Sequence, residues 1–147
     1  VDSVRYATTL GTNALIERRG PRVGLIVTAG FEAMVPLSRG RGYGEGLPDR
    51  LRRDLPMAQR PAPLVPVQMI VGIRERVAET GEIVMAVDPE DVRDCVRKLV
   101  DNGVQAFVVS LVNAVVQPEH ELLVEEIIRD EFPEHLLGSD PPLPPLT

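Results

Sequence analysis

The sequence predicts an α/β fold, and three observations lead to this prediction. Short apolar runs, such as residues 24–27, are typical of buried strands. Two longer segments, after Asp88 and Pro118, carry apolar residues at helical spacing. Glycines and prolines separate these segments, so that strands and helices follow one another along the chain. The predicted order is a βαβ unit, a β-hairpin, and then a helix, a strand and a helix.

Residues 1–35 are expected to form the βαβ unit. Val4–Thr8 is expected to be a strand, about Thr12–Arg19 a helix, and Arg22–Thr28 a second strand. Between the helix and the second strand lies Gly20-Pro21. The glycine suits the left-handed conformation that often follows a helix, and the proline prevents the helix from continuing.

Residues 36–66 differ in composition, with six prolines, four glycines and six arginines and almost no apolar periodicity. We expect a long loop here, and loops of this length are usually functional or disordered. Beyond it, Met69–Val77 and Ile83–Val87 are runs typical of strands. Residues 78–82 join them and contain a glycine that can adopt positive φ. The two runs therefore predict a hairpin.

The segment after Asp88 has the clearest helical pattern. Asp88 is a good N-cap, Pro89 fits the first helical position, and Asn102-Gly103 provides a stop. Residues 104–112 form a nearly continuous apolar run, as expected of a strand covered on both faces. Pro118 then opens a second helix that extends to about residue 131. Its carboxylates are expected to face solvent: Glu119, Glu121, Glu125, Glu126, Asp130 and Glu131.

Residues 67–135 are thus predicted to form an α/β subdomain, and the tail 136–147 differs from it. Prolines occupy positions 141, 142, 144 and 145 of this tail. Because proline cannot donate a backbone hydrogen bond, the tail is not expected to form a helix or a central strand. We expect it to be extended and mobile.

Composition limits the partners of the chain. Its 22 acidic and 16 basic side chains give a net charge of −6, which argues against nucleic acid or an anionic membrane as a partner. Cys95 is the single cysteine and cannot form an internal disulfide. No apolar run of about 18 residues is present that would span a bilayer. We therefore expect a cytoplasmic protein.

Several motifs occur in a distinctive order. The first is ATTLGTNALIERRG at residues 7–20, and the second is VGLIVTAGF at residues 23–31. Later ones are Arg39-Gly40, Pro63-Leu64-Val65-Pro66, Glu75-Arg76-Val77, Gly81-Glu82 and Pro118-Glu119-His120-Glu121. Over about residues 5–135 this order and spacing resemble the hydantoinase A/5-oxoprolinase family, which includes ATP-dependent acetone and acetophenone carboxylase subunits.

The resemblance implies that the chain is a fragment of the N-terminal region of a longer enzyme with an actin-like ATPase fold. The implied activity is ATP-dependent activation of a small carbonyl compound. It would be either hydrolysis of a cyclic amide such as hydantoin or 5-oxoproline, or carboxylation of a ketone. ATP and a divalent metal are the implied cofactors of the full-length enzyme, whereas we expect none bound by this fragment. The implied partner is another copy of the chain or a hydantoinase B-type subunit.

Three departures from the family pattern qualify this expectation. The family's glycine-rich phosphate loop would lie upstream of Val1, so the 147 residues alone are expected to be inactive. Asn113-Ala114 stands where many members have His-Ser. Beyond Gly138 the proline-rich tail replaces a further strand, and the chain is expected to be truncated. A non-catalytic α/β interaction module of a multisubunit complex therefore stays an alternative.

The candidate substrate-binding residues lie in the first motif. Thr8, Thr9, Thr12 and Asn13 occupy a predicted strand-to-helix turn, where hydroxyls and backbone amides can hold a phosphate or a substrate carbonyl. Thr12 could equally be a plain N-cap. Arg39 can hold an anionic group with two parallel N–H donors, although a surface role is the default for an arginine. No residue is assigned a catalytic role.

The remaining candidates have ordinary structural interpretations. Cys95 falls on the apolar face of its predicted helix and is expected to be a small core residue. His120 lies in the first turn of the second helix, where a structural role is expected. His135 is the only other histidine, so imidazoles alone cannot form a metal site, and no metal ligand is predicted.

Overall fold

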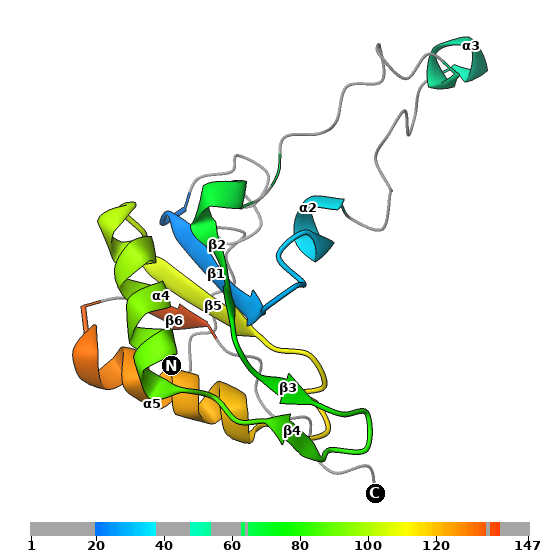
Figure 1. Cartoon of the computed structure of the whole chain (residues 1–147). Coiled ribbons are helices and arrows are strands. Elements are labelled where there is room, and N and C mark those ends of the chain that lie inside the picture. Colours follow the sequence, from blue (N-terminus) through cyan, green and yellow to red (C-terminus); the bar gives the residue numbers. More distant parts are fainter. Residues whose placement is uncertain (1–19, 38–47, 54–62, 64, 135, 139–147) are drawn as a thin grey trace, which may run out of the picture.

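The structure is a computed structural model, and it describes residues 20–37, 48–53, 63, 65–134 and 136–138. Its main feature is a four-stranded sheet with the order β2-β1-β5-β6, in which every neighbouring pair is parallel (Figure 1). The strands are β1 (Val23–Thr28), β2 (Ile70–Ile73), β5 (Ala106–Ser110) and β6 (Leu136–Gly138). A separate antiparallel hairpin pairs β3 (Arg76–Val77) with β4 (Ile83–Met85). The parallel sheet and its helices confirm the predicted α/β fold.

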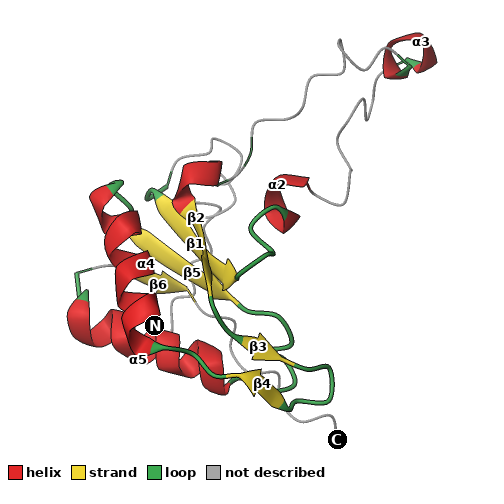
Figure 2. Ribbon diagram, viewed as in Figure 1, coloured by secondary structure: helices red, strands yellow, loops and turns green. Residues whose placement is uncertain are grey.

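Two long helices cover one face of the sheet (Figure 2). They are α4 (Pro89–Asp101) and α5 (Glu119–Glu131). Their apolar sides and one face of β1 and β5 enclose a core in which Ile26, Leu99 and Phe107 are fully buried. Among the described residues, Phe107 is the one aromatic side chain that is fully buried in this core, and most of its neighbours are aliphatic, as the low aromatic content predicts.

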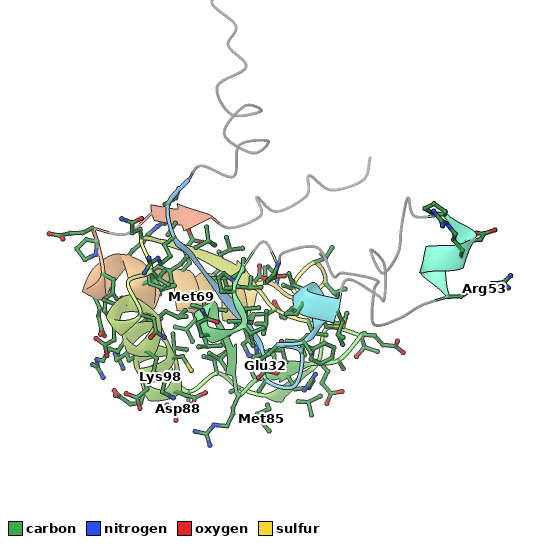
Figure 3. All side chains as sticks on the ribbon, turned by 90° about the horizontal axis from the view of Figure 1, so that it is seen from above. Glu32, Arg53, Met69, Met85, Asp88 and Lys98 are labelled. Atoms are coloured by element: carbon green, nitrogen blue, oxygen red, sulfur yellow. The ribbon has the colours of Figure 1, made fainter. Side chains whose placement is uncertain are left out.

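The other described helices are short. They are α2 (Met34–Leu37), α3 (Asp49–Arg52) and the 3-10 helix η2 (Val67–Met69). Figure 3 shows the side chains of the described residues, with Met69 in the interior and Met85 and Lys98 at the surface. None of the helices in the described part has the length and apolar composition needed to cross a bilayer.

The helices after Asp88 and Pro118 form where the sequence predicts them. Asp88 caps α4, since its Oδ1 accepts a hydrogen bond from the Glu90 N–H at 3.0 Å. The helix ends at Asn102 and Gly103, which is the predicted stop, and Gly103 has a positive φ of 80°. Val124, Ile127 and Ile128 form the buried side of α5. Local sequence signals therefore define both helices to within a residue or two.

Two predictions about the strands and one about the loop 36–66 need correction. The predicted strand 69–77 is two elements, because β2 pairs with β1 in the main sheet and only β3 belongs to the hairpin. Strand β5 is not covered on both faces among the described residues, since Val108 is 38% exposed and Ser110 is also exposed. The predicted loop 36–66 contains the single turn α3.

The predicted mobile tail and the first boundary also differ from the structure. Residues 136–138 form strand β6 beside β5, because the prolines begin only at position 141 and Leu136 and Leu137 can take part in a ladder. Strand β1, assigned to a separate 1–35 unit, lies inside the sheet of the 67–135 subdomain. The predicted strand 4–8, the predicted helix 12–19 and residues 139–147 lie outside the described residues.

The turn after β1 lies closely over Gly72 of β2. Val27 pairs with Gly72, and the Ala29 N–H donates to the Ile73 carbonyl at 2.8 Å. A Cβ added at Gly72 would lie 2.8 Å from the Cα of Ala29, which is backbone and cannot rotate away. Glycine is therefore required here by space, and this contact fixes where the chain leaves β1.

We expect Gly72→Ala to lower the free energy of unfolding by about 1–3 kcal/mol, because the added methyl group overpacks the contact between Gly72 and the backbone of Ala29. Gly20→Ala is the matched control, since nothing lies within 4 Å of a Cβ added there and Gly20 does not have the left-handed conformation predicted for it. It should change the free energy of unfolding by less than about 0.5 kcal/mol. Urea denaturation of both variants measures the difference, and equal stability would contradict the close approach.

Candidate functional site

The carboxyl ends of β1, β2 and β5 meet at one edge of the sheet. After β1 the chain runs to β2 on one side, and after β2 it crosses to β5 on the other side. The strand order thus reverses between β1 and β5. In open parallel sheets ligands bind at such a switch point, outside the carboxyl ends of the strands. The segments that follow these three strands are therefore the place to look for a site.

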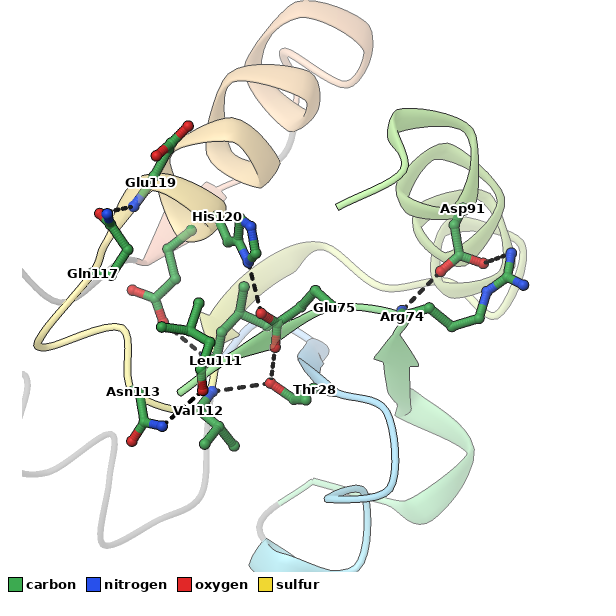
Figure 4. Close-up of polar contacts among 12 residues, drawn as sticks. Thr28, Arg74, Glu75, Asp91, Leu111, Val112, Asn113, Gln117, Glu119 and His120 are labelled. Carbon is green, nitrogen blue, oxygen red and sulfur yellow. Dashed lines mark hydrogen bonds and ion pairs between the residues drawn. The ribbon is translucent and has the colours of Figure 1, made fainter. Parts of the chain in front are cut away.

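A buried polar network joins the three segments (Figure 4). Thr28 ends β1, Glu75 lies just after β2, and His120 is in the first turn of α5; these residues are 0%, 2% and 5% exposed. Oε2 of Glu75 lies 2.7 Å from Nδ1 of His120. The Thr28 hydroxyl donates to Oε1 of Glu75 and accepts a hydrogen bond from the Val112 N–H at 2.9 Å.

The directions of these hydrogen bonds follow from the donors. The Val112 amide can only donate, so the Thr28 oxygen accepts and its proton is directed to Glu75. An ionised Glu75 accepts with both oxygens, which places a proton on Nδ1 of His120. A buried carboxylate is costly unless it is paired and hydrogen-bonded, and here it has both partners. The network therefore holds the loops after β1, β2 and β5 to the start of α5.

A second set of contacts fixes the loop after β5. Oε1 of Glu121 accepts a hydrogen bond from the Leu111 N–H at 2.7 Å, so this carboxylate is not purely solvent-facing as predicted. The Glu125 side chain is also largely covered, at 12% exposed, and it pairs with Arg129. Asn113 has a φ of 62°, and its Nδ2 donates to the Val77 carbonyl at 2.8 Å. This asparagine ties the loop to the hairpin.

The turn after β1 is held in a similar way. Gly30 has a φ of 93°, and its N–H donates to Oε2 of Glu32 at 2.9 Å. Arg76, at the start of the hairpin, donates from Nη2 to the Ala29 carbonyl at 3.3 Å. Its guanidinium also lies over the Phe31 ring, 5.2 Å from the centroid. The turn thus connects β1 to the residue that follows Glu75.

The predicted substrate-binding residues are not among these. Thr8, Thr9, Thr12, Asn13 and Arg39 lie outside the described residues, so their role stays a prediction.

The two other candidates have the roles expected of them. Cys95 is buried in the core as predicted, and burial, followed by the nearby Asp91 charge, raises the pKa of its thiol. A raised pKa makes the thiol a poor nucleophile. His120 is buried at the predicted first turn of α5 and contacts Glu75.

Sequence reasoning missed Thr28 and Glu75 as members of a site. Thr28 is a polar residue at the end of an apolar run, and Glu75 is a carboxylate directly after another strand. Polar residues that end neighbouring parallel strands are a signal for a shared edge. That signal was not visible, because the run containing Glu75 was assigned to the hairpin rather than to the sheet.

The buried network does not form a metal site among the described residues. Glu75 uses both carboxylate oxygens on Thr28 and His120. In the part of the chain that the structure describes, no group of three or more His, Cys, Asp or Glu side chains could hold a metal ion. The network is therefore a support at the edge of the sheet rather than a ligand set.

Comparison with known proteins identifies the family. Residues 1–132 match the family model of the hydantoinase/oxoprolinase N-terminal region. The chain is also 40% identical over 141 residues to the acetophenone carboxylase gamma subunit of Aromatoleum aromaticum, a match that covers 96% of this chain and 19% of that subunit. The chain therefore belongs to the hydantoinase/oxoprolinase family, in its N-terminal region.

Two solved structures share the fold. One is nucleotide-free acetone carboxylase, from work on ATP-dependent acetone carboxylation, with a TM-score of 0.76 and 27% identity over 86% of this chain and 18% of that one. The other is the ATP-dependent caprolactamase of Pseudomonas jessenii, with a TM-score of 0.75 and 28% identity over 90% of this chain and 18% of that one. The chain spans about a fifth of the length of the relatives described here.

We expect Thr28→Val to lower the free energy of unfolding by about 1–3 kcal/mol, because it leaves the Val112 N–H and one Glu75 oxygen without a buried partner. Thr28→Ser keeps the hydroxyl and should cost only about 1 kcal/mol, for the lost methyl group. Chemical denaturation of both variants makes the comparison. A valine variant as stable as wild type would show that the hydroxyl does not hold the edge.

Proposed function

We propose that this chain forms the N-terminal part of an ATP-dependent enzyme that activates a small carbonyl compound, and that the reaction is carboxylation of a ketone. The observation that carries this proposal is the 40% identity to the acetophenone carboxylase gamma subunit, which extends over nearly the whole chain. The fold alone does not choose a reaction, because a carboxylase and a caprolactamase match it equally well.

Hydrolysis of a cyclic amide, such as hydantoin or 5-oxoproline, is the second candidate. The similarity to the caprolactamase supports it. Both reactions begin at a carbonyl group whose oxygen must be made a better acceptor of negative charge, so one fold can support either. A non-catalytic interaction module remains as an alternative to both.

In this proposal the residues of this chain frame the substrate side of the cleft. Thr8, Thr9, Thr12 and Asn13 contact the carbonyl group, and Arg39 contacts an anionic group. The buried network of Thr28, Glu75 and His120 supports the sheet edge from which these loops extend. Other parts of an actin-like ATPase fold bind ATP and its divalent metal.

We further propose that the enzyme works in the cytoplasm as a homo-oligomer or with a hydantoinase B-type subunit. The relative named as a gamma subunit supports a multisubunit assembly. The acidic composition supports neither nucleic acid nor an anionic membrane as a partner.

The test is an assay of the complete gene product that contains these residues, purified with its partner subunits. We expect consumption of acetophenone or acetone that requires both ATP and bicarbonate, the carboxyl donor. The matched controls omit bicarbonate or replace the ketone by hydantoin or 5-oxoproline. The 147 residues alone should not hydrolyse ATP. Bicarbonate-independent opening of hydantoin or 5-oxoproline would contradict carboxylation and favour the hydrolase.

A further inference from the structure

Arg76 is one of the arginines of the described part that form no ion pair there; Arg22 is another, and its side chain donates to the Asn102 carbonyl at 3.3 Å. Four others each form an ion pair with a carboxylate. Arg76 forms none with any carboxylate of the described residues, and the one hydrogen bond of its side chain there is to the Ala29 carbonyl, at 3.3 Å. The paired arginines are Arg74 with Asp91, Arg93 with Glu90 and Glu131, Arg97 with Asp94, and Arg129 with Glu125.

The Arg76 guanidinium is nevertheless held in place. It lies over the Phe31 ring, with 5.2 Å between Cζ and the ring centroid, and the residue is only half-buried. A guanidinium that lies over an aromatic ring keeps its charge, while the ring limits how the guanidinium plane can turn. Only Nη2 is used by the Ala29 carbonyl, so other N–H donors of the fork remain for a ligand.

Arg76 also lies near the carboxyl edge of the sheet, where open parallel sheets bind their ligands. Ala29 and Phe31 directly follow β1, beside the point where the strand order reverses. Glu75, the preceding residue, is buried in the network with Thr28 and His120. The backbone that carries Arg76 is therefore fixed by a buried anchor one residue away.

We propose that Arg76 binds a small oxyanion with two coplanar oxygens, and that this ligand is bicarbonate. A planar guanidinium matches such an anion with two parallel charge-assisted hydrogen bonds, which a lysine cannot provide. The choice of bicarbonate rests on the proposed carboxylation, in which the ketone is neutral, ATP is bound by other parts of the enzyme, and bicarbonate is the remaining anionic substrate. Phosphate has similar oxygens, and the test separates the two.

The experiment measures binding of ¹³C-labelled bicarbonate by NMR to the complete gene product, without ATP or ketone. Arg76→Gln should weaken binding at least about tenfold, because it removes charge-assisted hydrogen bonds. Arg74→Gln is the matched control, since Arg74 is two residues away, is 70% exposed and pairs with Asp91. It should bind bicarbonate as wild type does. Unlabelled phosphate should compete poorly.

A second measurement needs no variant. An arginine-specific dicarbonyl reagent is applied to the wild-type protein, and labelled residues are located by mass spectrometry. Bicarbonate should slow the modification of Arg76 at least about threefold and leave the modification rate of Arg74 unchanged. The reason is that a bound anion covers the guanidinium of Arg76 and not that of Arg74.

Unchanged bicarbonate affinity in Arg76→Gln, no binding to wild type, or equal competition by phosphate would overturn the proposal. Equal labelling of Arg76 with and without bicarbonate would also overturn it. Because neither measurement uses turnover, an enzyme that binds bicarbonate at Arg76 but carboxylates no ketone would contradict the proposed function alone.

Discussion

The contact between Glu75 and His120 is the interaction on which the carboxyl edge of this sheet depends. It joins the segment after β2 to the first turn of α5, and through Thr28 it also reaches the end of β1 and the backbone of the loop after β5. All three side chains are almost completely buried. A carboxylate in such a place is tolerated only while its partners remain, so the loops are coupled to one another.

This coupling relates the fold to the function proposed for it. Loops at a switch point must be positioned by a rigid scaffold if they are to bind a substrate. Here the side chains that hold the loops together are buried. The neighbouring side chain of Arg76 instead contacts the Ala29 carbonyl and the Phe31 ring, after β1. Acetone carboxylase and the caprolactamase share this fold, so the fold alone does not decide which reaction takes place.

The sequence predicted what local signals determine. Asp88, Pro89 and Gly103 specify α4 through a cap, a fixed φ and a positive φ, and each acts within a few residues. The sequence predictions failed where contacts between residues far apart in the sequence determine the structure. Glu75 and His120 are 45 residues apart, and nothing near Glu75 shows whether its strand joins β1 or the hairpin. Strand β6 was missed because prolines further along the tail outweighed Leu136 and Leu137, whereas the positive φ of Asn113 depends on its tertiary bond to Val77.

The most direct test is a double-mutant cycle on Glu75 and His120, with the free energy of unfolding measured in urea. Glu75→Met and His120→Leu should each cost about 3–5 kcal/mol, because each leaves a buried polar partner uncompensated. The double variant should cost at least about 2 kcal/mol less than the sum of the two, since it removes both polar groups together. Additive costs, or single variants that each lose less than about 1 kcal/mol, would show that this contact does not hold the edge.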